Sequence, residues 1–319
     1  MTPPRSVLSQ FEFPWVKLRW QPALLGFSGA KVWRGENGDQ PLFALKAWPE
    51  GVSAARLAGI HRWMTHAAHL PFVPRVLFAA NGRTTVLEAG RLWDVTTWMP
   101  GSPRPSPTLL GLRAACTAVA RLHSVWRTDS PSGQCPGVRN RLQLLRDWMS
   151  SPRPDFAVSL TPRLDSLVLR AVALISRAAP EAIRTLERWE HRPLRLQPCL
   201  RDLRSDHVLF IGNEIGGIVD YGAMAEDHPA VDLARLLGDF SWHHGFPVSA
   251  ALDCYREAGG LLETPDEFVG ELTRTGLLGS AIHWLRRLGH TAGSQLPMEQ
   301  VEARFALLVE RIEYFAPMG

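Results

Sequence analysis

The hydrophobic pattern of this chain changes at one point, and that change limits the folds the chain can adopt. Before the Pro/Ser-rich stretch PGSPRPSP (100–107), short segments such as PLFALKAW read as strands separated by turn signals such as ENGD. After it, apolar residues recur with helical spacing, as in LLGLRAACTAVARLHSVW. The sequence therefore predicts an α+β fold with two lobes: an N-terminal antiparallel sheet lobe and a larger helical C-terminal lobe.

The predicted lobes cover residues 1–98 and 108–319, joined by a hinge at 99–107. The first should hold a five-stranded sheet, one helix within 53–69, and a hairpin that turns at Ala89-Gly90. In the second, the first helix should bury Leu109, and a helix over about 164–190 should be interrupted near Pro180. The only clear strand signal after the break is the hairpin HVLFIGNEIGGIVDYG.

Composition excludes several classes of protein. The 319 residues carry a net charge of +4, and the arginines are scattered, which argues against nucleic acid as the main partner. Four cysteines lie far apart without a CxxC pair, which disfavours a zinc site or a disulfide framework. Because neither a signal peptide nor a membrane-spanning apolar run is visible, we expect a cytoplasmic protein that does not bind membranes.

Lys46 is the first residue with a chemical implication. Lysine is rare in this chain, and Lys46 lies in the apolar segment FALKAW, where its charge loses hydration unless an anion meets it. A Gly26-Phe27-Ser28-Gly29 turn precedes it by one hairpin, and glycines let backbone amides approach phosphates closely. We interpret Lys46 as a phosphate-facing lysine; the alternative is a lysine on an edge strand that reaches solvent.

A second group of residues surrounds the hairpin HVLFIGNEIGGIVDYG. Its fold should bring His207, before the first strand, close to Asp220, after the second, with Asp202 just upstream. Two carboxylates and an imidazole in one small region suit a general base beside a metal ion at phosphate oxygens. The alternative is that Asp202 and Asp220 cap turns, where aspartate is common.

The segment DHPAVDLARLLGDF carries the signals of a helix start followed by a buried apolar face. Asp232 falls in the first turn of this helix, where the macrodipole favours a carboxylate. We therefore interpret Asp232 as structural.

Taken in order, these motifs resemble those of the aminoglycoside phosphotransferase/choline kinase family, which has a protein-kinase-like fold. LRDLRSDHVLF resembles the family's H-G-D-x-H-x-x-N loop, and GIVDYG resembles its metal-binding strand end. DHPAVDLARLLGDF is similar to the D-P-x-x-D-L-A segment, AVARLHSVW to the L-x-x-L-H helix end, and WMPG to the hinge between the lobes. The resemblance covers roughly residues 22 to 290 and implies a kinase of small molecules.

The resemblance also implies roles for individual residues. Asp202 would be the catalytic base that accepts the proton of a substrate hydroxyl, and Arg204 would contact the γ-phosphate. Asp220, with His207 beside it, would bind Mg²⁺, or Mn²⁺, between the phosphates of ATP. Lys46 would contact the α- and β-phosphates. The acceptor would be a hydroxyl group of a small-molecule metabolite or antibiotic.

For the nucleotide, the resemblance implies two further contacts. The glycine turn, represented by Gly26, Ser28 and Gly29, would cover the phosphates of ATP. The backbone at Trp98 and Met99 would take the edge of the adenine ring.

The sequence departs from the family pattern at three places. His207 stands where the family has its metal-binding asparagine, although Mg²⁺ prefers oxygen ligands. Leu200 replaces the histidine of H-G-D, and residues 52–86 contain no acid that would pair with Lys46, which leaves Glu50 or Glu88 as substitutes. Two alternatives to a kinase therefore stay open: a pseudokinase that binds nucleotide as a sensor or scaffold, and a fold with an unrelated function.

The substrate is constrained only by charge. The region expected to line its site is rich in arginine, with Arg139, Arg141 and Arg146, and it offers no acidic cradle for a polycationic aminoglycoside. An uncharged or anionic acceptor is the better match, although the same arginines would also suit a solvated surface.

Overall fold

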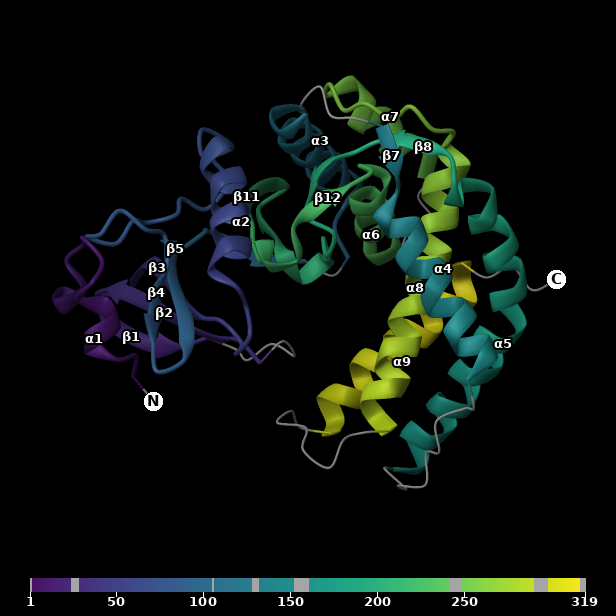
Figure 1. Ribbon diagram of the computed structural model, residues 1–319, viewed down its shortest axis with the longest axis horizontal. Coiled ribbons are helices and arrows are strands. Elements are labelled where there is room, and N and C mark those ends of the chain that lie inside the picture. The colour runs from purple at the N-terminus through teal and green to yellow at the C-terminus, as the bar shows by residue number, and fades with distance from the viewer. Residues whose placement is uncertain are drawn as a thin grey trace. The chain divides into compact units, whose positions relative to one another are not determined.

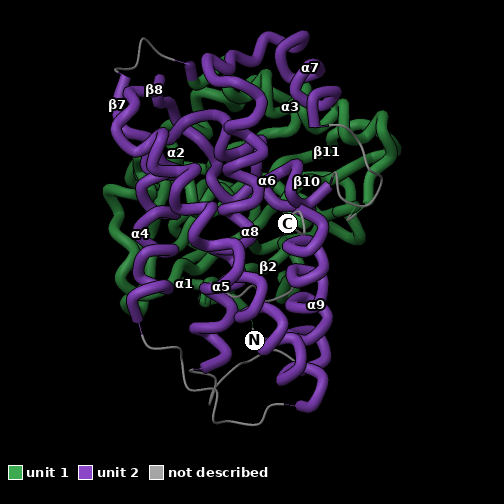
Figure 2. Tube along the Cα trace, turned by 90° about the vertical axis from the view of Figure 1, so that its right-hand side faces the viewer, with its two compact units in different colours: residues 1–126, 206–224 green, residues 127–205, 225–319 purple. Residues whose placement is uncertain are grey.

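The computed structural model describes residues 2–23, 29–104, 106–127, 132–151, 161–240, 248–289 and 298–315. The chain forms two compact units, one of residues 1–126 with 206–224 and the other of residues 127–205 with 225–319 (Figure 2). An antiparallel sheet dominates the first unit and helices dominate the second (Figure 1), which confirms the predicted α+β fold class. The hinge at 99–107 stays a prediction.

The sheet of the first unit contains five strands, β1 (Arg19–Pro22), β2 (Lys31–Asn37), β3 (Gln40–Ala47), β4 (Val86–Glu88) and β5 (Arg91–Thr97). Their order is β1-β2-β3-β5-β4, and every neighbouring pair is antiparallel. The predicted hairpin turns are confirmed, at Gly38 with φ 59° and at Ala89-Gly90 with φ 48° and 73°. Because β3 lies in the middle of the sheet, the alternative of an edge-strand lysine at position 46 is wrong.

One face of this sheet carries the apolar core of the unit. The Trp33 and Trp93 rings stack 5.3 Å apart, and Leu45 and Val95 are fully buried beneath α1 (Arg5–Leu8) and the residues that follow it. Residues alternate between faces along a strand, so Lys46 and Asp94, which pair in register on β3 and β5, lie on the opposite face. The core thus leaves that second face for polar side chains.

Helix α2 (Ala54–His66) forms where the 3.6-residue spacing predicts it. The Ser53 hydroxyl accepts a hydrogen bond from the amide of Arg56 and caps its start. The predicted apolar residues Leu57, Ile60 and Met64 are buried. His61 is buried as well and reaches the sheet, where its Nε2 lies 3.0 Å from Asp94 Oδ2. This contact holds α2 against the face that carries Lys46.

The first unit is completed by α3 (Leu109–Trp126) and by a small sheet of β6 (Ser102–Pro103), β10 (Val208–Ile211) and β11 (Glu214–Ile218). The predicted hairpin is confirmed, with Val208 opposite Ile218 and Ile211 opposite Glu214. Leu109, by contrast, is 44% exposed, so its predicted burial is wrong. It begins the helix, and the packed stripe starts at Leu112.

The second unit is built from α4 (Pro136–Ser150), α5 (Pro162–Glu190), α6 (Ala230–Phe240), α7 (Val248–Glu257), α8 (Asp266–Gly289) and α9 (Met298–Phe315). Helix α5 runs through Pro180 without a break, so the predicted interruption is wrong. Ala179 and Ala182 are buried beside the proline, and packing against α4, α8 and α9 offsets the lost backbone bond.

Two pairs of three-residue strands in this unit were not predicted. They are β7 (Ser132–Gln134) with β8 (Pro193–Arg195), and β9 (Gln197–Cys199) with β12 (Ala225–Asp227). Segments this short show no periodic pattern, and only their partners make them strands. Among the described residues, no helix combines the length and the apolar character that crossing a membrane requires.

Candidate active site

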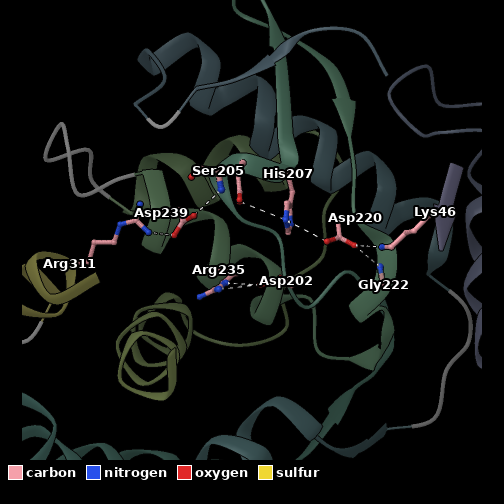
Figure 3. A network of polar contacts seen from close by, with 10 residues as sticks. Lys46, Asp202, Ser205, His207, Asp220, Gly222, Arg235, Asp239 and Arg311 are labelled. Carbon is pink, nitrogen blue, oxygen red and sulfur yellow. Dashed lines mark hydrogen bonds and ion pairs between the residues drawn. The ribbon is translucent and has the colours of Figure 1, made fainter. Parts of the chain in front are cut away.

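Lys46 lies at the centre of the polar face of the sheet. Its Nζ atom is 3.0 Å from Asp220 Oδ1, and the same ammonium stands 4.0 Å from the centroid of the Trp48 ring. The side chain is 18% exposed, so it is partly desolvated but open to a ligand. Figure 3 shows Lys46 and Asp220 pointing toward each other from β3 and from the end of β11.

Asp220 follows β11 in a left-handed conformation, with φ 59° and ψ 67°. Residues other than glycine rarely adopt this region, and such residues cluster at functional sites. The amide of Gly222 donates a 3.4 Å bond to Asp220 Oδ1. Loss of hydration raises the pKa of Asp220, but the charges of Lys46 and His207 and the bonds from Lys46 and Gly222 lower it more. The pKa therefore lies below its usual value, and the group stays an anion.

His207 lies at the base of the hairpin, as the register predicts. Its carbonyl accepts a 2.9 Å bond from the amide of Val219, next to Asp220. The imidazole Nε2 is 3.7 Å from Asp206 Oδ1 and 3.8 Å from Asp220 Oδ2, so it stands between two carboxylates. Asp206 was not among the predicted site residues, although its position next to His207 was the available signal.

Asp202 belongs to the second unit, on a loop that two carboxylates of α6 hold. Asp232 accepts bonds from the amides of Leu200 (2.7 Å) and Arg201 (2.6 Å), and Arg201 has a φ of 66°. Asp239 Oδ2 accepts a 2.9 Å bond from the amide of Ser205 (Figure 3). Because each end of the loop is tied to the same helix, the position of Asp202 is set by α6.

The Asp202 carboxylate itself contacts Arg235 of α6. Arg235 Nε and Nη2 lie 3.3 Å and 3.2 Å from Asp202 Oδ1, and Arg235 Nη1 donates to the Ser280 hydroxyl of α8 at 3.0 Å. The side chain of Asp202 is 37% exposed, so this carboxylate is anchored but accessible. Sequence reasoning missed Arg235, which stands one helical turn after Asp232. Arg204, on the same loop, is partly exposed.

Asp227 supports this loop from inside the second unit. The fully buried carboxylate accepts bonds from the amides of Gly137 and His228, both at 3.0 Å. Its other oxygen lies 3.2 Å from Arg201 Nε. Burial and the charge of Asp227 together raise the pKa of the neighbouring Cys135 thiol to about 12. The DHP segment is therefore a structural anchor that joins α4 to the Asp202 loop.

The structure describes only some of the residues that are predicted to contact the nucleotide. Gly26 and Ser28 lie outside the described residues, while Gly29 has a φ of 72°, which suits the predicted glycine turn. The amide of Trp98 donates a 2.8 Å bond to the carbonyl of Leu42. Met99 is buried at 6% exposure.

The substitutes expected for the missing helix carboxylate do not contact Lys46. Glu50 pairs with Arg91 at 3.4 Å, and Glu88 accepts a 2.8 Å bond from the Ser6 hydroxyl. The acidic partner of Lys46 is Asp220 instead.

A model of the phosphotransferase enzyme family matches residues 19–268, which is most of the chain. The chain belongs to the phosphotransferase enzyme family. This confirms the resemblance seen in its motifs. Among curated proteins, no sequence is significantly similar to this member of the phosphotransferase family.

Solved structures show the same fold at low sequence identity. A spectinomycin phosphotransferase in complex with ADP and spectinomycin has a TM-score of 0.69 at 13% identity, covering 93% of this chain and 92% of that one. An aminoglycoside phosphotransferase from Alicyclobacillus acidocaldarius has a TM-score of 0.60 at 16% identity, covering 99% and 94%. An amicoumacin kinase with AMP-PNP and Ca²⁺ has a TM-score of 0.57 at 15% identity, covering 97% and 91%. At such identities the likeness establishes the fold.

Proposed function

We propose that this family member transfers the γ-phosphate of ATP to a hydroxyl group of a small-molecule metabolite or antibiotic. The observation that carries the proposal is the contact of 3.0 Å between Lys46 and Asp220, a lysine and a carboxylate 174 residues apart in sequence. A phosphate-binding lysine beside a metal-binding carboxylate is the arrangement that phosphoryl transfer requires. The chain further offers Asp202 on an anchored loop as the base.

For the nucleotide, Lys46 is assigned to the α- and β-phosphates and the turn at Gly26, Ser28 and Gly29 to their cover. The amide of Trp98 is already bonded to Leu42, so the carbonyl of Trp98 and the backbone of Met99 are assigned to adenine. Supporting this assignment, proteins of the same fold bind ADP and AMP-PNP.

The residues near Asp220 fit a divalent cation. Asp220 and Asp206 offer carboxylate oxygens, the ligands that Mg²⁺ prefers, and the imidazole of His207 stands between them. A cation held there would neutralise charge on the phosphate oxygens. Asp220 is the main assigned ligand, and His207 either contributes a nitrogen, which suits Mn²⁺, or orients Asp220.

Asp202 is assigned to the proton of the acceptor hydroxyl. Arg235 contacts Asp202 Oδ1 and so fixes the position of the carboxylate that would accept this proton. When the hydroxyl oxygen attacks the γ-phosphorus, the proton passes to Asp202 and the bond to the β-phosphate oxygen breaks, leaving ADP. Arg204 is assigned to the γ-phosphate oxygens.

The prediction of an uncharged or anionic acceptor rested on Arg139, Arg141 and Arg146, and the structure shows the surroundings of two of them. Arg146 pairs with Glu187 and Glu190 of α5, so it is a structural residue. Arg141 bonds the Gly137 carbonyl at 2.8 Å, while its buried Nε has no hydrogen-bond partner among the described residues. Burial lowers the pKa of Arg141 below its usual value. The charge of Asp227 acts on Arg141 from nearby and offsets part of this lowering, so an uncharged or anionic acceptor stays a prediction.

Calorimetric titration tests the nucleotide site. Lys46→Ala and Asp220→Ala should each weaken the binding of ATP with Mg²⁺ tenfold or more, which is about 1.4 kcal/mol. Each removes a charge assigned to the phosphates or to their metal ion. Lys31→Ala is the matched control, because Lys31 is an exposed lysine on the neighbouring strand β2. Unchanged affinity in both test variants would remove the site assignment.

The pseudokinase alternative rests on His207, and His207→Asn separates it from an active kinase. We expect the wild-type protein to release ADP with an acceptor found in a panel of metabolites and antibiotics, and His207→Asn to raise the rate with Mg²⁺. The reason is that an amide oxygen replaces a nitrogen near the metal. The control is His66→Asn, at an exposed histidine of α2. Nucleotide binding without transfer in wild type, with activity gained in His207→Asn, would establish the pseudokinase instead.

A further inference from the structure

The ammonium group of Lys46 rests on an aromatic ring. Its Nζ lies 4.0 Å from the centroid of the Trp48 ring. Trp48 directly follows β3 and is two residues after Lys46, so both side chains lie on the same face of the sheet. Trp48 is 8% exposed and the Lys46 side chain is 18% exposed, so this contact is largely withdrawn from solvent. A cation over an indole face is stabilised by about 0.5–2 kcal/mol, depending on its desolvation.

Two buried side chains, Asp94 and His61, hold the ring of Trp48 in place. Trp48 Nε1 donates a 2.6 Å bond to Asp94 Oδ2, and His61 Nε2 lies 3.0 Å from the same oxygen. Asp94 and His61 are 3% and 2% exposed. The backbone of Trp48 is held as well, because its amide donates a 2.8 Å hydrogen bond to the carbonyl of Leu92 on β5. Helix α2 thus helps to position Trp48 through His61 and Asp94, and Trp48 in turn contacts the ammonium group of Lys46.

Trp48 also touches the turn of Asp220. A Cβ atom at Gly222 would lie 3.1 Å from Trp48 Cζ3, so the ring packs closely against that turn. Arg56 of α2 donates a 2.9 Å bond to the Gly222 carbonyl. The same helix therefore supports both partners of the Lys46–Asp220 contact, one through the ring and one through the backbone.

We propose that Trp48, anchored by Asp94 and His61, is the positioning residue for Lys46 and takes the place of a carboxylate on α2. An aromatic face attracts the ammonium without neutralising its charge, whereas a carboxylate would compete with phosphate for it. Trp48 thus holds Lys46 in place without adding a second carboxylate to the one already present at Asp220. This inference rests on the proposed function, since it concerns the lysine assigned to the phosphates.

The test compares ADP with adenosine, because only ADP carries phosphates. Trp48→Leu should weaken the binding of ADP with Mg²⁺ about tenfold, a value within the range of a desolvated cation–π contact, and leave adenosine binding unchanged. In a Lys46→Ala background, Trp48→Leu should have no further effect on ADP. Trp48→Phe keeps an aromatic face and should restore most of the ADP affinity.

Trp33→Leu is the matched control. Trp33 is a buried tryptophan on the opposite face of the same sheet, so its loss tests general damage to the sheet. Equal weakening of ADP and adenosine by Trp48→Leu, or weakening that persists without Lys46, would overturn the inference and leave a structural tryptophan. If wild type does not bind ADP, the proposed function itself fails. If Lys46→Ala weakens ADP but Trp48→Leu does not, only the positioning role fails.

Discussion

Replacing Asp202 with asparagine is expected to slow phosphoryl transfer by about 1,000-fold, in the middle of the range for a lost general base. The substitution keeps the shape of the side chain and an oxygen that can accept the bond from Arg235. It removes the carboxylate that takes the proton from the attacking hydroxyl. The measurement is ADP release with the acceptor identified in the panel, at saturating ATP.

Binding of ATP to Asp202→Asn should be nearly unchanged, because Asp202 is not assigned to the nucleotide. This separates a catalytic effect from a general loss of structure. Arg235→Lys is a second test of the same role. A lysine cannot reproduce the guanidinium contacts with Asp202 and Ser280. This variant should therefore transfer phosphate more slowly and bind ATP with normal affinity. Retention of a tenth or more of the wild-type rate by Asp202→Asn would exclude it as the base.

Replacing Asp232 with alanine is expected to lower the free energy of unfolding by about 3 kcal/mol, the cost of leaving one buried and one partly buried amide without acceptors. Asp232 is fully buried, and its two oxygens accept the amides of Leu200 and Arg201. Arg201 adopts a left-handed conformation at φ 66°, which the loop tolerates while this carboxylate holds it. The measurement is denaturant unfolding followed by circular dichroism.

Asp165→Ala is the control for this prediction. Asp165 occupies the first turn of α5 as Asp232 occupies that of α6, so both lose the interaction with a helix dipole, worth about 0.3–1 kcal/mol. Similar losses in the two variants would show that the dipole, and not the loop amides, accounts for Asp232. The buried position of Asp232 agrees with its interpretation as a structural residue. Its hydrogen-bond partners, however, are the amides of the Asp202 loop, whereas the sequence indicated only the dipole of its own helix.

Local patterns in the sequence were sufficient for much of the fold. Alternation in PLFALKAW, the turn at Ala89-Gly90 and the spacing of Leu57, Ile60 and Met64 each depend on residues close in sequence, and each element forms where it was predicted. The approach of His207 to Asp220 followed for the same reason, because a hairpin fixes which residues meet at its base.

Features that depend on distant residues were decided only by the tertiary structure. Pro180 ends no helix, because packing of α5 against three other helices outweighs a local preference. The unpredicted strand β9 forms because β12 lies beside it.

The support of the candidate site belongs to the same class. The sequence indicated Lys46 and Asp202 as candidate site residues, because a charged group in an apolar segment needs a partner. It did not indicate that Lys46 contacts the Trp48 ring, that Asp94 holds this ring, or that Arg235 contacts Asp202. A side chain's partner depends on which elements pack together, and contacts between residues 33 or 46 positions apart leave no periodic signal in one sequence. The sequence by itself therefore indicated the candidate site residues, and the tertiary structure determined which side chains contact them.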